Sequence, residues 1–359
     1  MKRIVKPVGA LLVLVAVIAG GYVAYVFIDY HRLPDMDVES PFPYDHDGEA
    51  LATAEPYRVV TWNLGFGAYS DDYSFFMDGG KESRAFSREA VLRNIGRAVR
   101  VLDGLDASFK LLQEIDFDST RSYRVDEVGM IADALGGYQN FGQNYDSPYL
   151  FYPVTRPHGA SKSGLLTLSA AWIDRLARIS LPVEAGFMKL LDLDRCYSKS
   201  WIPVADGRHL VLYNLHLSAY SNDGTIADEQ LALLTADMKA EYEAGNYVVG
   251  GGDFNKDLPG NSQEVFGVSG EAYTWARPLK NEAIPEGLKL VYALDLEHPV
   301  PTCRNTDTGY VPGKTFVLIV DGFIVSDNIK VVDCQTVDEG FAASDHNPVV
   351  MTFELEPSL

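Results

Sequence analysis

Residues 246–257 read NYVVGGGDFNKD, a short apolar run that passes through glycines to an aspartate and an asparagine. The β-branched residues near its start are typical of a buried strand, and the glycines mark its end. Asp253 and Asn255 follow directly and are alternate residues, so their side chains should point to the same side. The sequence therefore predicts a buried strand that carries a carboxylate and a carboxamide at its carboxyl end.

Similar polar residues occur at the ends of other predicted strands. They are Asn63 after VVTW, Glu114 after KLLQ, His216 after LVLYNL, Asp321 after TFVLIV, and Asp345 with His346 before NPVVM. Any one of them has an ordinary structural explanation, such as a turn, a solvated strand exit or a hydrogen-bonded core histidine. Active sites, however, gather at the ends of rigid strands. The repetition therefore favours a functional site over a series of unrelated turns.

The apolar periodicity predicts helices and strands that mix without strict alternation. Ser87 is a cap residue, and the apolar residues behind it have helical spacing over 87–105. Further helices are expected at about 122–135 and 227–245, and strands at 57–66, 109–116, 163–169, 208–218, 246–254, 315–326 and 347–355. This order predicts one α/β domain in which two β-sheets pack together with helices outside.

The N-terminal segment, residues 1–28, differs from the rest of the chain. Lys2, Arg3 and Lys6 precede an uncharged stretch that is long enough, as a helix, to cross a hydrocarbon core of about 30 Å. A retained membrane anchor is favoured over a cleaved signal peptide, because the apolar region of a signal peptide is shorter and no A-x-A site is evident. By the positive-inside rule, the rest of the chain would lie outside the cytoplasm.

Residues 29–56 are rich in proline and acids and have no lasting apolar period, so they are expected to form a tether. The folded domain would then occupy residues 57–359. A secreted protein after signal cleavage and a soluble cytoplasmic enzyme are the alternatives. Both depend on whether residues 1–28 remain in a membrane.

The net charge of the 359 residues is −20, which opposes non-specific binding to nucleic acids and other polyanions. Nucleic acid is therefore a less favoured partner, although local cations in one cleft can reverse the field. Three cysteines, Cys196, Cys303 and Cys334, allow at most one intramolecular disulfide, and their spacing is not that of a zinc site. We also expect a monomer.

The motif order from Tyr57 to the C-terminus resembles the endonuclease/exonuclease/phosphatase superfamily of metal-dependent phosphoesterases. The motifs, in chain order, are TWN, LLQEID, SGLLTLS, YNLHLSAY, GGDFN, VDGFIVS and SDHNPVV. The resemblance implies a four-layer α/β sandwich with its active site at one rim. His216 in NLH matches the branch of pancreatic-type deoxyribonucleases, bacterial sphingomyelinases and inositol-phosphate phosphatases, whereas abasic-site endonucleases typically have a tyrosine motif there.

The resemblance implies a metal site and names its ligands. Glu114 would be the principal ligand of Mg²⁺, and Asn63 would add a neutral oxygen directly or through water. Asp345 would be an adjacent carboxylate that faces the metal or a second cation. Mn²⁺ and Ca²⁺ are the alternative cations.

Catalytic roles follow from the same resemblance. His346 would be the general base, and Asp321 would orient its imidazole. His216 would donate to a phosphoryl oxygen or to the leaving group. Asp253 and Asn255 would hold the scissile phosphate and the attacking water.

Other segments are candidates for substrate contacts. The aromatic-rich loop 65–87 carries Lys81 and Arg84 and lies next to the predicted metal site, so it is a candidate substrate lip, although an ordered surface loop is an equal alternative. Arg304 in PTCRN is a candidate phosphate contact. Gly250 to Gly252 are expected to clear side chains from the strand end so that phosphate can approach.

These expectations together predict an extracytoplasmic, membrane-anchored, Mg²⁺-dependent phosphoesterase. A phospholipid head group, an inositol phosphate or another small phosphoester is the expected substrate. A secreted or tethered nuclease that acts on DNA is the main alternative. A non-catalytic binding protein that kept the fold is a lesser one, because every expected catalytic position holds a competent residue type.

Overall fold

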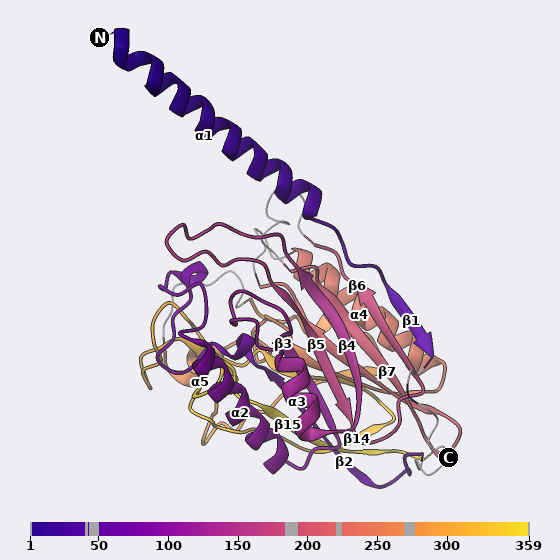
Figure 1. The fold of residues 1–359 in the computed structure, drawn as a ribbon. Helices are drawn as coiled ribbons and strands as arrows, with labels where there is room; N and C mark the ends of the chain where they lie inside the picture. Colours follow the sequence, from indigo (N-terminus) through magenta and orange to yellow (C-terminus); the bar gives the residue numbers. More distant parts are fainter. Residues whose placement is uncertain are drawn as a thin grey trace.

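A computed structural model of the chain places a long N-terminal helix, α1 (Lys2–Asp29), beside an α/β body from which the helix projects (Figure 1). The structure describes residues 2–39, 42, 50–183, 193–219, 225–268 and 277–357. By length and composition, Val8–Asp29 could cross a membrane, and almost none of it is buried against the body. A signal sequence has the same features, so the helix is consistent with either interpretation.

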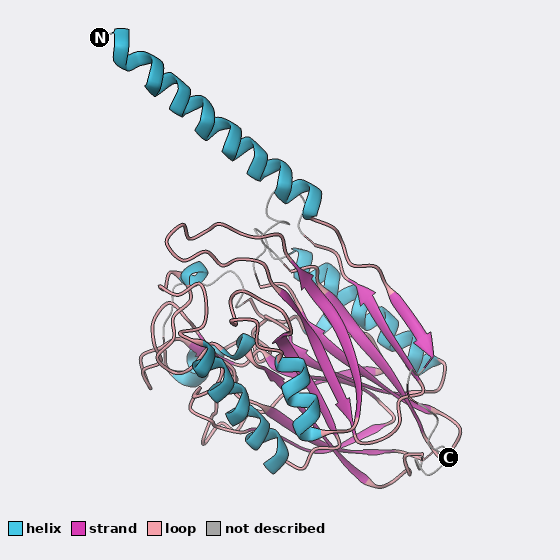
Figure 2. Ribbon diagram, viewed as in Figure 1, coloured by secondary structure: helices cyan, strands magenta, loops and turns pink. Residues whose placement is uncertain are grey.

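Two mixed β-sheets form the centre of the body (Figure 2). The first has the strand order β1 (Met36–Glu39), β6 (Arg175–Ser180), β7 (Cys196–Pro203), β8 (His209–His216), β9 (Tyr247–Asp253), β13 (Asp321–Ser326) and β10 (Leu288–Val291). The second has the order β14 (Ile329–Thr336), β15 (Val349–Leu355), β2 (Pro56–Asn63), β3 (Phe109–Asp116), β5 (Lys162–Ser169) and β4 (Tyr138–Asp146). Only the pairs β8–β9 and β2–β3 are parallel among the described strand pairs of these sheets.

Helices cover the outer faces of both sheets. The helices α2 (Arg88–Gly104) and α3 (Glu127–Leu135) pack on the second sheet, and α4 (Thr225–Glu243) packs on the first. Between the sheets lies an apolar core that joins Phe109 and Met351 of one sheet to Val249 and Phe323 of the other. The result is the predicted four-layer α/β sandwich, helix, sheet, sheet, helix.

Local sequence signals explain several of these elements. The Ser87 side chain accepts a hydrogen bond from the Ala90 N–H at 3.2 Å, which satisfies one free donor at the start of α2. One apolar face of α2 is buried, as its helical periodicity predicts. The strand expected at 315–326 is divided, because a two-residue strand β12 (Val317–Leu318) pairs with β11 (Cys303–Arg304) before β13 begins at Asp321. The remaining short elements are α5 (Ser262–Phe266), η1 (Gly65–Gly67), η2 (Phe76–Asp78) and η4 (Asn281–Ala283).

The glycines of β9 permit close packing of the layers. An added Cβ at Gly252 would lie 1.9 Å from the carbonyl oxygen of Leu215, and one at Gly251 would lie 2.6 Å from the Phe323 ring. Neighbouring backbone and core side chains therefore fill the space that these glycines leave. The expectation that they clear a path for phosphate is wrong.

The expected tether is structured in part. Met36–Glu39 forms β1, which extends the first sheet by pairing antiparallel with β6. Upstream of β1, Arg32 forms an ion pair with Asp194 at 2.6 Å, and the Leu33 N–H donates to the same carboxylate. Residues 40–41 and 43–49 of the expected tether lie outside the described residues. The chain between α1 and β2 is thus fastened to the body at its described N-terminal part.

Candidate active site

Strand register brings the predicted polar residues to one rim of the two sheets. In the first sheet, both His216 of β8 and Asp321 of β13 lie opposite Asp253 of β9. In the second sheet, β2 ends at Asn63, next to Glu114 of the neighbouring strand β3. Residues that are far apart in the sequence therefore meet because their strands end at the same edge.

Glu114 reaches the site through an irregularity in β3. The pairing of β3 with β5 shifts register between Leu112 and Ile115, and Glu114 has a φ angle of 54°, in the left-handed region. Bulges of this kind redirect one side chain and are common beside active sites. The Glu114 carboxylate consequently lines a pocket at this rim, which we call the active-site pocket. There, Nδ2 of Asn63 donates to Oε1 of Glu114 at 3.1 Å.

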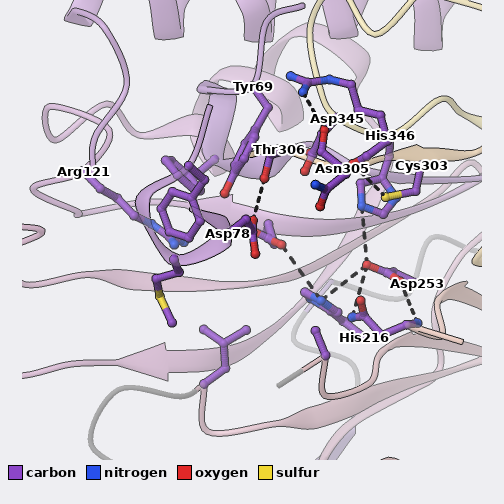
Figure 3. A pocket seen from close by; sticks show the side chains of 18 of the residues that line it. Tyr69, Asp78, Arg121, His216, Asp253, Cys303, Asn305, Thr306, Asp345 and His346 are labelled. Carbon is purple, nitrogen blue, oxygen red and sulfur yellow. Dashed lines mark hydrogen bonds and ion pairs between the residues drawn. The ribbon is translucent and has the colours of Figure 1, made fainter. Parts of the chain in front are cut away.

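The Asp253 carboxylate lies between two histidines (Figure 3). Its Oδ2 atom is 3.5 Å from Nε2 of His216 and 3.6 Å from Nε2 of His346, and it accepts a hydrogen bond from Nδ2 of Asn63 at 3.1 Å. Its Oδ1 atom accepts from the backbone N–H of Asn255 at 2.8 Å. Burial raises the pKa of Asp253, although the charge of His346 opposes the shift. This carboxylate is therefore held in place from several sides.

His346 and Asp321 form a second buried pair at the rim. Nδ1 of His346 lies 2.8 Å from Oδ2 of Asp321. The indole N–H of Trp62 donates to the backbone carbonyl of His346 at 2.8 Å and fixes the segment that carries the histidine. Because Nδ1 is bonded to the carboxylate, Nε2 is the ring atom left to act in the pocket.

The two histidines differ in their tendency to bind a proton. Burial lowers the pKa of His346, but Asp321, followed by Cys303 and Asp253, outweighs it and raises the pKa well above its ordinary value of 6.5. Burial, followed by Arg195, lowers the pKa of His216 well below that value. His346 therefore holds a proton more readily than His216 does.

Asn63 does not present its oxygen to the predicted metal position. Its Oδ1 atom accepts a hydrogen bond from the Gly65 N–H at 3.0 Å, and its Nδ2 atom faces the carboxylates of Glu114 and Asp253. Its expected role as a neutral oxygen ligand is therefore not supported by these contacts. The geometry instead makes Asn63 a residue that positions two carboxylates.

The carboxylates of Glu114 and Asp345 suit a divalent cation. The pKa of Asp345 is raised to about 6, chiefly by burial and also by the charge of Glu114, against the opposing effects of His346 and Arg304. Carboxylates that repel each other are stabilised by a cation, and oxygen ligands of this kind suit Mg²⁺. Ligand atoms of Asp253, Asp321 and His346 also lie within 4.8 Å of one another. Asp321 and His346 already bond each other, so we retain Glu114 and Asp345 as the expected cation ligands.

The loop after β2 supplies an apolar wall of the pocket. The side chains that line it there are Phe66, Tyr69, Phe75 and Met77, with Asp78. The candidates Lys81 and Arg84 do not line the pocket: Lys81 is exposed, and the Arg84 side chain donates to the backbone carbonyl of Pro157. The loop thus lines the pocket with aromatic side chains, and Lys81 and Arg84 take no part in that lining.

Arg304 lines the pocket as expected, yet its guanidinium is bound to backbone. Nη2 donates to the carbonyl of Ser70 at 2.8 Å and to that of Tyr73 at 3.2 Å. Nη1 donates to the carbonyls of Asn305 and Thr308. The predicted phosphate contact does not fit this arrangement. Arg304 instead fastens the loop after β2 to the segment around β11.

Several pocket residues gave no signal in the sequence. Arg121 binds both carboxylate oxygens of Asp116, at 2.9 and 3.0 Å, and lies 3.9 Å above the Phe66 ring. Thr306 donates to the Asp78 carboxylate, although the two residues are 228 positions apart in the sequence. Arg195 also lines the pocket. So do Asn305 and Thr306 (Figure 3). Only the tertiary fold brings these residues together, so no local motif could have identified them.

Sequence comparison gives no family for this chain, since no protein-family model and no curated protein matches it. Solved structures match in fold. An endonuclease/exonuclease/phosphatase from Beutenbergia cavernae superposes with a TM-score of 0.57 at 17% identity, over 84% of this chain and 72% of that one. ANGEL2, a 2′,3′-cyclic phosphatase solved with adenosine-2′,3′-vanadate, superposes with a TM-score of 0.57 at 16% identity, over 91% of this chain and all of that one (100%).

A third match is TDP2 from Caenorhabditis elegans, with a TM-score of 0.53 at 14% identity, over 84% of this chain and 75% of that one. The chain therefore has the fold of the endonuclease/exonuclease/phosphatase superfamily. The fold expected from the motif order is confirmed.

Proposed function

We propose that this protein is a metal-dependent phosphoesterase that hydrolyses a phosphodiester or phosphomonoester by attack of an activated water. The main observation behind this proposal is that Asp253 Oδ2 lies within 3.6 Å of both His216 Nε2 and His346 Nε2. The carboxylates of Glu114 and Asp345 line the same pocket. The fold supports this chemistry, because ANGEL2, which shares it, is a 2′,3′-cyclic phosphatase.

Glu114 and Asp345 would hold the cation, Mg²⁺ by preference, with Mn²⁺ or Ca²⁺ as alternatives. A divalent cation supplies positive charge that stabilises the phosphoryl oxygens in the transition state. Asn63 keeps the Glu114 carboxylate oriented through the hydrogen bond to Oε1.

His346 would accept the proton of the attacking water at Nε2. Its partner Asp321 bonds Nδ1, which fixes the tautomer and stabilises the positive charge that forms on the imidazole. Its Nε2 atom must be neutral to act as a base, so activity should require a pH above its pKa. The raised pKa makes His346 a strong but pH-sensitive base.

His216 would act as a hydrogen-bond donor. Its Nε2 atom lies 3.5 Å from Asp253 and 3.9 Å from Glu114, so the proton of the neutral ring belongs at Nε2. From there it can donate to a phosphoryl oxygen or to the leaving group. Asp253 and Asn255 are linked by a hydrogen bond and would orient the phosphate and the water.

A small phosphoester is the favoured substrate class, namely a phospholipid head group, an inositol phosphate or a similar molecule. The net charge of −20 disfavours long polyanions. A DNase-like nuclease is the second candidate, because Arg195 places a positively charged side chain in the pocket wall of a protein whose overall charge is negative. We further propose that α1 anchors a monomer whose body lies outside the cytoplasm, because basic residues precede the apolar stretch of α1.

A substrate panel tests this function. The full chain in detergent is incubated with Mg²⁺ and, in turn, with a chromogenic phosphodiester, inositol phosphates, sphingomyelin, double-stranded DNA and RNA. Release of phosphate or alcohol that stops when the metal is chelated supports the proposal. Absence of turnover with every phosphoester would overturn it.

A further inference from the structure

The segment that joins β4 to β5, residues 147–161, exposes large apolar side chains. We call it the β4–β5 loop. Phe151 is 56% exposed, Tyr152 is 68% exposed and Val154 is 80% exposed. Adjacent apolar residues with this exposure are unusual on a protein surface that faces only water.

The β4–β5 loop is well fixed, so its apolar exposure does not result from loose structure. Leu150 and Gly159 exchange two backbone hydrogen bonds across its base, at 3.2 and 3.0 Å. Nδ1 of His158 bonds the Ser83 carbonyl at 2.9 Å. Nη2 of Arg156 donates to the Ala85 carbonyl at 2.7 Å. The loop therefore presents Phe151, Tyr152 and Val154 in one defined arrangement.

The same loop contacts the C-terminal turns of α1 (Figure 1). The Tyr22 hydroxyl donates to the Tyr149 carbonyl and accepts from the Phe151 N–H, both at 3.1 Å. The Tyr25 hydroxyl accepts from the Tyr149 N–H at 3.0 Å. The rings of Tyr22 and Phe151 meet edge to face at 5.6 Å. Tyrosines near the end of an apolar span are typical of the membrane–water interface, so the loop lies at that depth.

The loop also reaches the pocket lip. Tyr152 and His158 pack against the Phe76 ring, with ring centroids 5.7 and 6.1 Å apart. His158 itself lines the pocket, and so does Met77, which is next to Phe76 and is exposed. An apolar surface thus runs from the end of α1, across the β4–β5 loop, to the wall of the active-site pocket.

We propose that the β4–β5 loop inserts Phe151, Tyr152 and Val154 into the head-group region of the bilayer that holds α1. The pocket lip then lies at the lipid surface, so the substrate is a phosphoester lipid drawn from that bilayer. The statement about substrate rests on the proposed phosphoesterase function, whereas the insertion of the loop into the bilayer does not. A bilayer is favoured over a protein partner because α1 contacts the loop and brings it to the interface.

Insertion of the β4–β5 loop is tested with a fluorescent label on the full chain in phosphatidylcholine vesicles. Cys196 and Cys303 are buried, so Cys334→Ser removes the one partly exposed native thiol. An environment-sensitive fluorophore is then attached through Val154→Cys or through the control Val332→Cys, which lies on β14, away from α1 (Figure 1). A quencher carried by the lipid should quench the label at position 154 and leave the one at 332 unchanged. An unquenched label at 154 would overturn the proposal.

The substrate source is tested with a matched pair of charge substitutions. Val154→Asp should reduce turnover of a phosphodiester lipid in vesicles about tenfold, the loss expected from one buried apolar side chain, and leave a soluble chromogenic phosphodiester unaffected. Val332→Asp, at a residue 51% exposed, should change neither rate. Equal turnover of vesicle lipid by Val154→Asp and the native chain would contradict the lipid source. Quenching at position 154 without turnover of any phosphoester would instead reject the proposed function and still support insertion of the loop.

Discussion

Nδ1 of His346 lies 2.8 Å from Oδ2 of Asp321, and both side chains are buried. Asp321 begins β13 in the first sheet, whereas His346 precedes β15 in the second. The pair therefore joins the two sheets at the rim that carries the candidate active site. It also couples the proton affinity of the expected general base to a fixed negative charge.

The charge of Asp321 should set the pH dependence of activity. Asp321 raises the pKa of His346, so the base becomes neutral, and activity rises, only above pH 6.5. Asp321→Asn removes that charge and should move the midpoint of the acid limb to lower pH. It should also lower kcat by about 10²–10⁴-fold, because the tautomer is no longer fixed. The pH profile of kcat/KM checks this, and an unmoved midpoint would contradict it.

Glu114→Gln should weaken the dependence of activity on Mg²⁺. The substitution keeps the shape of the side chain on the β3 bulge and removes the charge expected to bind the cation. We expect the Mg²⁺ concentration for half-maximal activity to rise by at least about tenfold. Lys81→Gln, at an exposed residue outside the pocket, is the control. Matching Mg²⁺ titrations for Glu114→Gln and the native chain would place the metal elsewhere.

Divalent cations should stabilise the fold more at neutral pH than at acidic pH. Burial raises the pKa of Asp345 to about 6 and also raises that of Asp253. A carboxyl with a raised pKa in the folded state favours folding when protonated, so this stability is lost as pH rises through about 6. Bound Mg²⁺ should offset the loss, because it requires the ionised form. The increase in Tm on adding Mg²⁺ should be larger at about pH 7.5 than at about pH 5. The reverse order would argue against Asp345 as a ligand.

Gly252→Ala should strongly destabilise the protein. The added Cβ would lie 1.9 Å from the Leu215 carbonyl oxygen, so β8 and β9 would have to separate. We expect a loss of about 3 kcal/mol or more in the free energy of unfolding. Gly104→Ala, where no atom lies within 4 Å, is the control and should not destabilise. Denaturant unfolding measures both, and equal stability of the two variants would show that β9 does not need a glycine there.

Residues whose role follows from local pattern could be predicted from the sequence. The strand FKLLQEID was expected at 109–116 and forms β3 with those bounds. His216, Asp253 and Asp321 were expected at strand ends and meet there, because β8, β9 and β13 are adjacent. Alternation of apolar residues and motif order carry this information, and neither depends on long-range packing.

Other features depend on tertiary contacts and could not be predicted. The strand β4 buries Asn140, which donates to the backbone carbonyl of Lys199 in the facing sheet, so its sequence lacks apolar alternation. The amide orientation of Asn63 is set by the Gly65 N–H. Arg304 donates its hydrogen bonds to backbone carbonyls that include that of Ser70, which lies more than two hundred residues earlier in the chain. A positively charged side chain near a predicted site in the sequence is therefore weak evidence that this side chain contacts the substrate.

The most direct test of the account compares the native chain with His346→Ala on a soluble chromogenic phosphodiester, with Mg²⁺ and after chelation. A positioned general base contributes about 10²–10⁴-fold, so His346→Ala should lose that factor while circular dichroism shows a folded protein. His346→Gln, which keeps a polar group beside Asp321, should lose as much. Metal-dependent turnover by the native chain that either substitution leaves unchanged would contradict the proposed mechanism.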